Sequence, residues 1–299
     1  MIKKFSVGLD KYGSRGKYEV WYEHYPSLSA LENGLQAKGP SMYTSGDDFL
    51  SESPWDPKWS GFSNPEELST LMKGGVRDTS AVRKVAKIKS GMNKGGYARR
   101  KVMDVVGEEV DIPTYLSGVP ECMEDVYRKP APRRAFRVVL DGSILGGVGG
   151  EDLTDAGIVL AKLVMSLEKG GRPVILSNFH AAIEEDNDEL MITTIDIRRP
   201  GTNLNPQKLL FATHPAFHRG AIFTWRARTM PHYCSMGRSL YAYIEDHDDF
   251  VRFLKDNIFR DKELYLIRVS DVVDLLPSKK ARKNGWEDEV IKELTRRYL

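Results

Sequence analysis

Cysteine is scarce in this chain. Only Cys122 and Cys234 are present among 299 residues, and they lie far apart in the sequence. Two such cysteines cannot build the multiple-bridge framework of small secreted domains, nor a zinc module with paired cysteine ligands. The sequence therefore predicts a protein of a reducing compartment, the cytoplasm.

Long apolar runs are also missing. The first residues, Met1 to Phe5, carry positive charge, but polar residues follow where a signal peptide has an apolar stretch of roughly 7–15 residues. No uncharged run approaches the roughly 18 residues that a membrane-spanning helix needs. We therefore expect neither export by a signal peptide nor a membrane partner.

Motifs of common catalytic sites are absent as well. The sequence has no G-x-x-x-x-G-K-[S/T] phosphate loop and no G-x-S-x-G nucleophile elbow. Of six histidines, only His214 and His218 have the spacing of a ligand pair, and Pro215 between them disfavours a shared helical face. Triads assemble from distant segments, so hydrolase chemistry stays open. We predict a non-enzymatic protein that uses no cofactor and no metal.

What the sequence does contain is enough apolar surface for a substantial core, with 41% hydrophobic residues. Its centre has a strand–helix–strand pattern. Residues 136–141 have the β-branched apolar character of a buried strand, a helical pattern runs from Ile158 to Leu167, and residues 173–176 form the next strand. This unit predicts an α/β fold with a central, mostly parallel sheet and flanking helices.

Other elements follow from the same patterns. We expect further strands at residues 190–197, 221–226 and 264–269, and helices at residues 248–257 and 287–298.

The N-terminal region, residues 1 to about 70, is rich in turn-forming residues. We expect irregular structure there, with one or two short strands and one helix. That helix begins at Pro65 with Asn64 as its cap and ends before Gly74-Gly75.

The chain is thus expected to have three parts. They are an irregular N-terminal region (1–72), a basic helix-loop segment with a linker at Pro130–Arg134 (73–134), and an α/β domain with a C-terminal helix (135–299).

The basic segment is the strongest functional signal. The whole chain has a net charge of only +2, but residues 73–101 contain ten Lys and Arg and one acid, Asp78. A short helix over residues 82–88 and a flexible loop over residues 90–97 are expected in it. Like charges at this density repel one another unless a polyanion neutralises them. The segment therefore predicts nucleic-acid binding, although a solvated helix face is the bland alternative.

Aromatic residues alternate with basic ones between Phe217 and Tyr243. Stacking platforms flanked by cations bind single strands, which favours single-stranded DNA as the partner, although Phe223 and Trp225 are expected to lie in the core. From charge and aromatic content we predict the following contact residues: Lys84, Lys87, Lys89, Lys94, Tyr97, Arg99, Arg100, Lys101, Arg133, Arg134, Arg226 and Arg228.

The region from Phe136 to Ile197 resembles a von Willebrand factor A domain, in which a strand ends in D-x-S-x-S and holds a divalent cation. Asp141 and Ser143 match this motif, but Leu145 replaces the second serine and cannot ligate a hard cation. We therefore expect no divalent cation at Asp141.

Together with this region, the segment from Trp59 to Gly75 resembles tailed-phage early proteins, namely the single-stranded-DNA-binding RNA polymerase cofactors of podophages with a two-subunit polymerase. The resemblance implies single-stranded DNA binding, recruitment of the phage RNA polymerase, no catalysis, and residence in the host cytoplasm if the protein is viral. Two alternatives stay open: an A-domain-like interaction module that works with an ATPase, and a metal-dependent nuclease using Asp141, Asp152 and Asp155. The sequence also leaves open whether the protein is a homo-oligomer.

Overall fold

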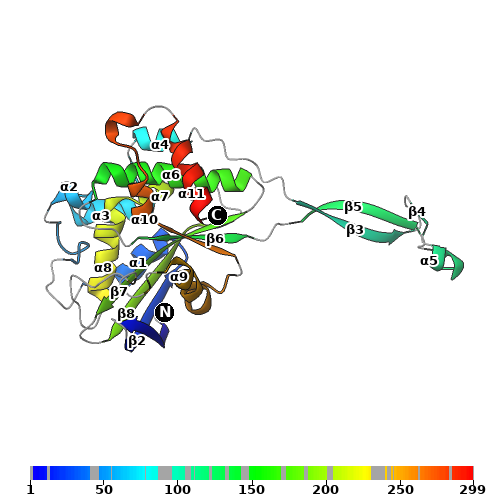
Figure 1. Ribbon diagram of the computed structural model, residues 1–299, viewed down its shortest axis with the longest axis horizontal. Helices are drawn as coiled ribbons and strands as arrows, with labels where there is room; N and C mark the ends of the chain where they lie inside the picture. Colours follow the sequence, from blue (N-terminus) through cyan, green and yellow to red (C-terminus); the bar gives the residue numbers. More distant parts are fainter. Residues whose placement is uncertain are drawn as a thin grey trace.

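The computed structural model shows a body built on a six-stranded sheet and an arm built on a three-stranded sheet, which is described over residues 96–104, 109–110, 112–120 and 123–131 (Figure 1). The structure describes residues 3–11, 14–40, 47–54, 56–77, 79–86, 96–104, 109–110, 112–120, 123–131, 135–142, 148–169, 173–184, 188–200, 205–229, 240, 244, 246–261, 263–282 and 285–298.

The sheet of the body has the strand order β1-β2-β8-β7-β6-β9. Its strands are β1 (Lys3–Lys11), β2 (Ser14–Tyr25), β6 (Phe136–Asp141), β7 (Val174–Glu184), β8 (Glu189–Arg198) and β9 (Leu264–Arg268). β2 is parallel to β8, and β6 is parallel to both β7 and β9, whereas β1 with β2 and β7 with β8 are antiparallel. The predicted α/β class is confirmed, with a mixed sheet.

The predicted strand–helix–strand unit is confirmed too. β6 and β7 are parallel neighbours, and the chain between them contains α6 (Gly150–Lys169). The centre of β6 is apolar because both of its faces are covered: Val138 and Leu140 belong to one core and Val139 to the other.

Helices cover both faces of this sheet. The larger core includes side chains of α1 (Leu28–Lys38), α3 (Pro65–Gly74), α4 (Thr79–Ala86), α6, α7 (Pro206–Phe211), α8 (Ile222–Thr229), α10 (Val269–Asp274) and α11 (Trp286–Tyr298). The smaller core includes Phe250 and Leu254 of α9 (His247–Leu254), which continues into a π-helix, η3 (Lys255–Phe259). Shorter elements are α2 (Pro57–Ser60), the π-helix η1 (Ala216–Ala221) and the 3-10 helix η4 (Lys279–Ala281). In the described part of the chain, no helix has the length and apolarity to cross a membrane.

The N-terminal region is more regular than its turn-rich composition indicates. β1 and β2 form a long hairpin, and Glu19 to Tyr25 of β2 pair in parallel with Glu189 to Ile195 of β8. The first 72 residues therefore contribute two strands to the same sheet as residues 135–299.

The strand predicted at residues 221–226 is wrong, because this segment is the junction of η1 and α8. Phe217, Ala221, Ile222 and Trp225 are all buried at helical spacing. The β-branched and aromatic residues of this segment favour a strand, in which alternate side chains are buried. Burial against the core instead follows the helical repeat.

The loop predicted over residues 90–97 is wrong from Gly96 onward. Gly96 and Tyr97 begin β3 (Gly96–Asp104), which pairs with β5 (Met123–Ala131) in an antiparallel ribbon. The predicted linker likewise begins within a strand, since Pro130 and Ala131 end β5. At the far end of the ribbon lie β4 (Glu109–Val110) and α5 (Ile112–Leu116), well away from the body (Figure 1).

The capped helix predicted after Asn64 is confirmed as α3. The Asn64 side chain accepts a hydrogen bond from the Glu67 backbone N–H at 2.8 Å, and Gly75 follows the helix with a φ of 83°. Asn64→Ala should lower the free energy of unfolding by about 1 kcal/mol, since it removes one acceptor of a helix N-terminus. Urea unfolding followed by tryptophan fluorescence measures this, and Asn64→Ser, which keeps an acceptor, should restore most of the loss.

Candidate nucleic-acid interface

The first part of the basic segment is an amphipathic helix on the body. α4 buries Ala81 and Val85 and leaves Arg83 and Lys84 exposed in its last turn. Lys84, one of the predicted contact residues, therefore lies on the surface, where a phosphate can reach it.

The second part is the antiparallel ribbon of β3 and β5. Arg99 lies directly opposite Arg128 in this pair, and Lys129 lies opposite Ala98. Residues opposite each other in an antiparallel pair share a face. The register therefore gives both faces of the ribbon cations, three on one and two on the other: Arg99, Lys101 and Arg128, and then Arg100 and Lys129.

Like charges at directly opposite positions destabilise a strand pair. The register sets Arg99 and Arg128 at such opposite positions. A bound anion that neutralises both positions removes this destabilisation.

Five predicted contact residues lie outside the described part of the chain: Lys87, Lys89, Lys94, Arg133 and Arg134. Four more lie in β3, where the register given above locates them: Tyr97, Arg99, Arg100 and Lys101.

Arg228, another predicted contact, serves the fold. Its Nε lies 2.9 and 3.0 Å from the two carboxylate oxygens of Asp48, and its Nη1 donates to the Leu35 carbonyl at 2.8 Å. The side chain is only 4% exposed. Breaking such a buried pair is costly. Arg228 therefore stabilises the fold and is not placed to bind a phosphate. Arg226 also lies in α8, with its guanidinium 5.7 Å from the ring centroid of Phe223.

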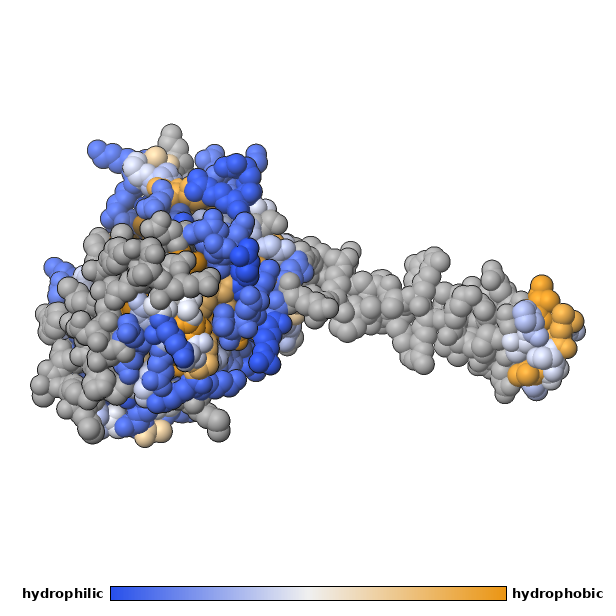
Figure 2. All heavy atoms as spheres, turned by 60° about the horizontal axis from the view of Figure 1, so that its bottom comes forward, coloured by the Kyte–Doolittle hydropathy of each residue, from blue (hydrophilic) through white to orange (hydrophobic). Residues whose placement is uncertain are grey.

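The sequence interpretation missed the outer end of the arm. Ile112, Tyr115, Leu116 and Val119 are 42–77% exposed, and they are the large apolar side chains with high exposure in the described residues. Figure 2 shows a hydrophobic (orange) patch at the outer end of the arm, where α5 lies. The sequence does contain a signal for this exposed apolar surface, namely a cluster of apolar residues between acidic residues and a proline.

A pair of buried histidines lies beside the carboxyl end of β6. The ring centroids of His180 (β7) and His218 (η1) are 5.1 Å apart. A Cβ on Gly142 would lie 2.0 Å from the His180 ring, so only glycine fits after Asp141. Burial lowers the pKa of His180 well below its usual value and that of His218 to about 3. Both rings are therefore neutral near pH 7, and π-helical segments such as η1 are frequent at functional sites.

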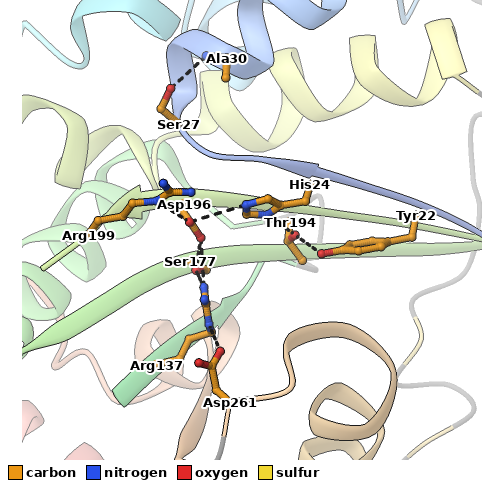
Figure 3. Close-up of polar contacts among 10 residues, drawn as sticks. All are labelled: Tyr22, His24, Ser27, Ala30, Arg137, Ser177, Thr194, Asp196, Arg199 and Asp261. Atoms are coloured by element: carbon orange, nitrogen blue, oxygen red, sulfur yellow. Dashed lines mark hydrogen bonds and ion pairs between the residues drawn. The ribbon is translucent and has the colours of Figure 1, made fainter. Parts of the chain in front are cut away.

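Polar side chains also form a chain across the sheet (Figure 3). Asp196 accepts hydrogen bonds from Ser177 Oγ at 2.7 Å, from Arg137 Nη1 at 3.0 Å and from Arg199 Nε at 2.9 Å. The Nε2 of His24 lies 3.7 Å from the same carboxylate. Burial lowers the pKa of His24, and Asp196 offsets this only in part. Two guanidinium groups thus balance the charge of Asp196 within the protein.

This chain of polar contacts borders a cavity of about 300 Å³. The cavity lies where the parallel strands β2 and β8 end, and its lining includes Ser27, Asp196, Arg199 and Lys208. Ligands of open α/β sheets bind in crevices at the carboxyl ends of strands. The volume is at the lower limit for a small-molecule site.

The geometry does not favour the nuclease alternative. Asp152 and Asp155 both pair with the guanidinium of Arg282, so both carboxylates already have a partner within the protein. Among the residues that the structure describes, no three His, Cys, Asp or Glu side chains are grouped to hold a metal ion. Ser143 and Leu145 of the D-x-S-x-S comparison lie outside those residues.

Comparison with known proteins gives one match. A family model described as a domain of unknown function (DUF7192) matches residues 9–296. Neither a curated protein nor a solved structure matches the chain.

Proposed function

The chain belongs to the DUF7192 family, whose description names no activity, and we propose that it binds DNA through the base of its arm, single-stranded DNA in preference to duplex. The base of the arm is defined as the half next to the body, Gly96–Lys101 of β3 with Val126–Ala131 of β5.

One observation carries the proposal. All five charged residues of this half are Lys or Arg, and no acid lies between them. The ribbon that contains them extends away from the body (Figure 1). Each cation that meets a phosphate releases counterions, which is a favourable entropy term. The exposed Arg83 and Lys84 of α4 add positive charge on the body.

Aromatic residues support the single-stranded preference. Tyr97 and Tyr127 are interleaved with the cations of the two paired strands. Unpaired bases can stack on such rings, at about 1–3 kcal/mol per base, whereas the bases of a duplex are already stacked. A two-stranded ribbon also fits the major groove of a duplex, so duplex DNA is the competing ligand to test.

The wider role that we propose is that of a non-enzymatic transcription cofactor that recruits a phage RNA polymerase. This extension is supported by the resemblance of the segment around Trp59 to Gly75 and not by a contact in the arm. The A-domain-like interaction module is the second candidate, supported by the strand β6 that ends at Asp141.

A binding titration tests the proposal. The full chain should bind a single-stranded oligonucleotide at least about tenfold more tightly than the same sequence as a duplex, because one additional stacked base supplies this difference. Fluorescence anisotropy at two salt concentrations measures both affinities. Equal or tighter binding of the duplex would overturn the single-stranded preference, and absence of binding to either form at low salt would overturn the proposal itself.

A further inference from the structure

The arm has opposite charges at its two ends. Residues 104–125, the stretch of sequence that includes β4 and α5 at the outer end of the arm, contain seven Asp and Glu and no Lys or Arg. The base of the arm contains five cations and no acid. We refer to residues 104–125 as the tip. The tip would be repelled by the phosphates that the base attracts, so it needs a different partner.

The tip is also apolar at its surface. Leu116 is 77% exposed, Ile112 64% and Tyr115 63%. Exposed apolar residues are normal when scattered, but a cluster with polar residues around it marks an interaction site. A partner for the tip should therefore present positive charge together with some apolar surface.

The base of a second copy has these properties. It carries five cations, and Tyr97, Val126 and Tyr127 stand among them. β3 is moreover an edge strand of the arm, since the strand order is β3-β5-β4. An unpaired edge is a ready surface for another chain.

We propose that two copies of this chain associate through their arms, which lie antiparallel, so that the acidic apolar tip of each copy covers the basic base of the other. A two-fold axis through the middle of the paired arms makes both contacts identical. This is the self-complementary arrangement of most homodimers. Opposite charges at the ends of one arm favour antiparallel pairing, because parallel pairing would set base against base and tip against tip.

The dimer covers the cations to which we assign DNA. Association of the arms and binding of DNA therefore exclude each other, and single-stranded DNA in excess should convert the dimer into DNA-bound monomers. This consequence rests on the proposed function, whereas the dimer itself does not.

Sedimentation velocity over a hundredfold range of protein concentration tests the inference in the absence of DNA. The full chain should be dimeric at low salt and should dissociate at high salt, because charge pairs at a surface are screened. The double variant Ile112→Ser, Leu116→Ser removes only exposed apolar surface, so it should fold normally and dissociate at concentrations where the wild type is dimeric. A chain that stays monomeric at all concentrations at low salt would overturn the inference, as would a dimer that this variant leaves unchanged.

Charge exchange gives a second, stricter test. One variant reverses the base to a net charge of −3 (Arg99→Glu, Arg100→Glu, Lys101→Glu and Arg128→Glu), and the other reverses the tip to a net charge of +3 (Glu108→Lys, Glu109→Lys, Glu121→Lys, Glu124→Lys and Asp125→Lys). Each variant alone should be monomeric, because its base and its tip then have charges of the same sign. An equimolar mixture should form a heterodimer, because each tip then meets a base of opposite charge. Circular dichroism of each variant checks that it is folded.

The two proposals fail separately. If the mixture stays monomeric while wild-type chain still binds DNA, the arm-to-arm dimer is wrong and the proposed function stands. If the mixture associates but no DNA is bound, the dimer stands and the proposed function is wrong.

Discussion

Replacing Arg99, Arg100 and Lys101 together by alanine should weaken binding of single-stranded DNA roughly 100-fold at about 0.1 M salt, without a change in base preference. All three residues lie in β3, at successive positions of the base of the arm. Each phosphate contact on a single strand contributes about 0.7 to the slope of log affinity against log salt concentration, which is about a factor of five at this salt. Three lost contacts therefore multiply to about two orders of magnitude.

The slope of log affinity against log salt concentration distinguishes direct phosphate contacts from general electrostatic attraction. It should become shallower by about 2 if all three side chains meet phosphates. A control variant removes the same number of exposed cations from the body: Arg252→Ala, Lys280→Ala and Lys292→Ala. The control has the same net charge as the test variant and should keep the wild-type slope. An unchanged slope in the arm variant, or an equal loss in both variants, would show that the arm does not contact DNA.

The sheet of the body could be predicted where local sequence and tertiary packing agree. β6 and β7 are buried on both faces, so their apolar runs are unambiguous, and the helical pattern between them repeats over many residues. The cap of α3 depends only on Asn64, Pro65 and the glycines that follow, and it is correct.

The failures occur where distant residues decide the structure. Residues 221–226 have a composition that suits a strand, but Trp225 is held in a helix by the core and by its Nε1–H, which donates to Glu23 at 2.9 Å. The arm was missed for a related reason. The glycines and charges of residues 90–97 indicate a loop. Gly96 and Tyr97 belong to a strand only because they pair with β5, more than 20 residues away in the sequence.

The candidate site shows the same limit. Charge density identified the segment that includes Arg99. It could not show that Arg228 is paired inside the fold, because its partner Asp48 lies 180 residues away in the sequence. The buried pair of His180 and His218 could not be predicted either, because each histidine by itself has an ordinary sequence context and only the fold brings the two rings together.

Lowering the pH from 7 to 5 should reduce the free energy of unfolding by about 2 kcal/mol through His218, with a further loss of the same sign through His180. Burial lowers the pKa of both rings in the folded chain, and their positively charged neighbours Arg226 and Arg219 act in the same direction. His214 also lowers the pKa of His218, and the Ala212 carbonyl opposes this weakly. The folded chain therefore keeps His218 neutral at pH 5 and disfavours protonation of His180.

The sign follows from proton uptake. In the unfolded chain both imidazoles bind a proton with a pKa near 6.5, so below that pH the unfolded state holds more protons and is favoured. The stability is complete above about pH 7 and falls as the pH decreases through the unfolded pKa. For His218 the fall continues until the pH reaches the folded pKa of about 3. Most carboxylates titrate below pH 5, so the interval from pH 7 to 5 reports mainly on histidines.

Urea unfolding at pH 7, 6 and 5, followed by tryptophan fluorescence, measures this dependence. The double variant His180→Gln, His218→Gln should lose most of the dependence on pH, whatever its stability at pH 7, because glutamine does not titrate. Each single variant should lose part of the dependence on pH. Equal stability of the wild type at pH 7 and 5, or an undiminished pH dependence in the double variant, would show that the two rings are not held neutral in the folded chain.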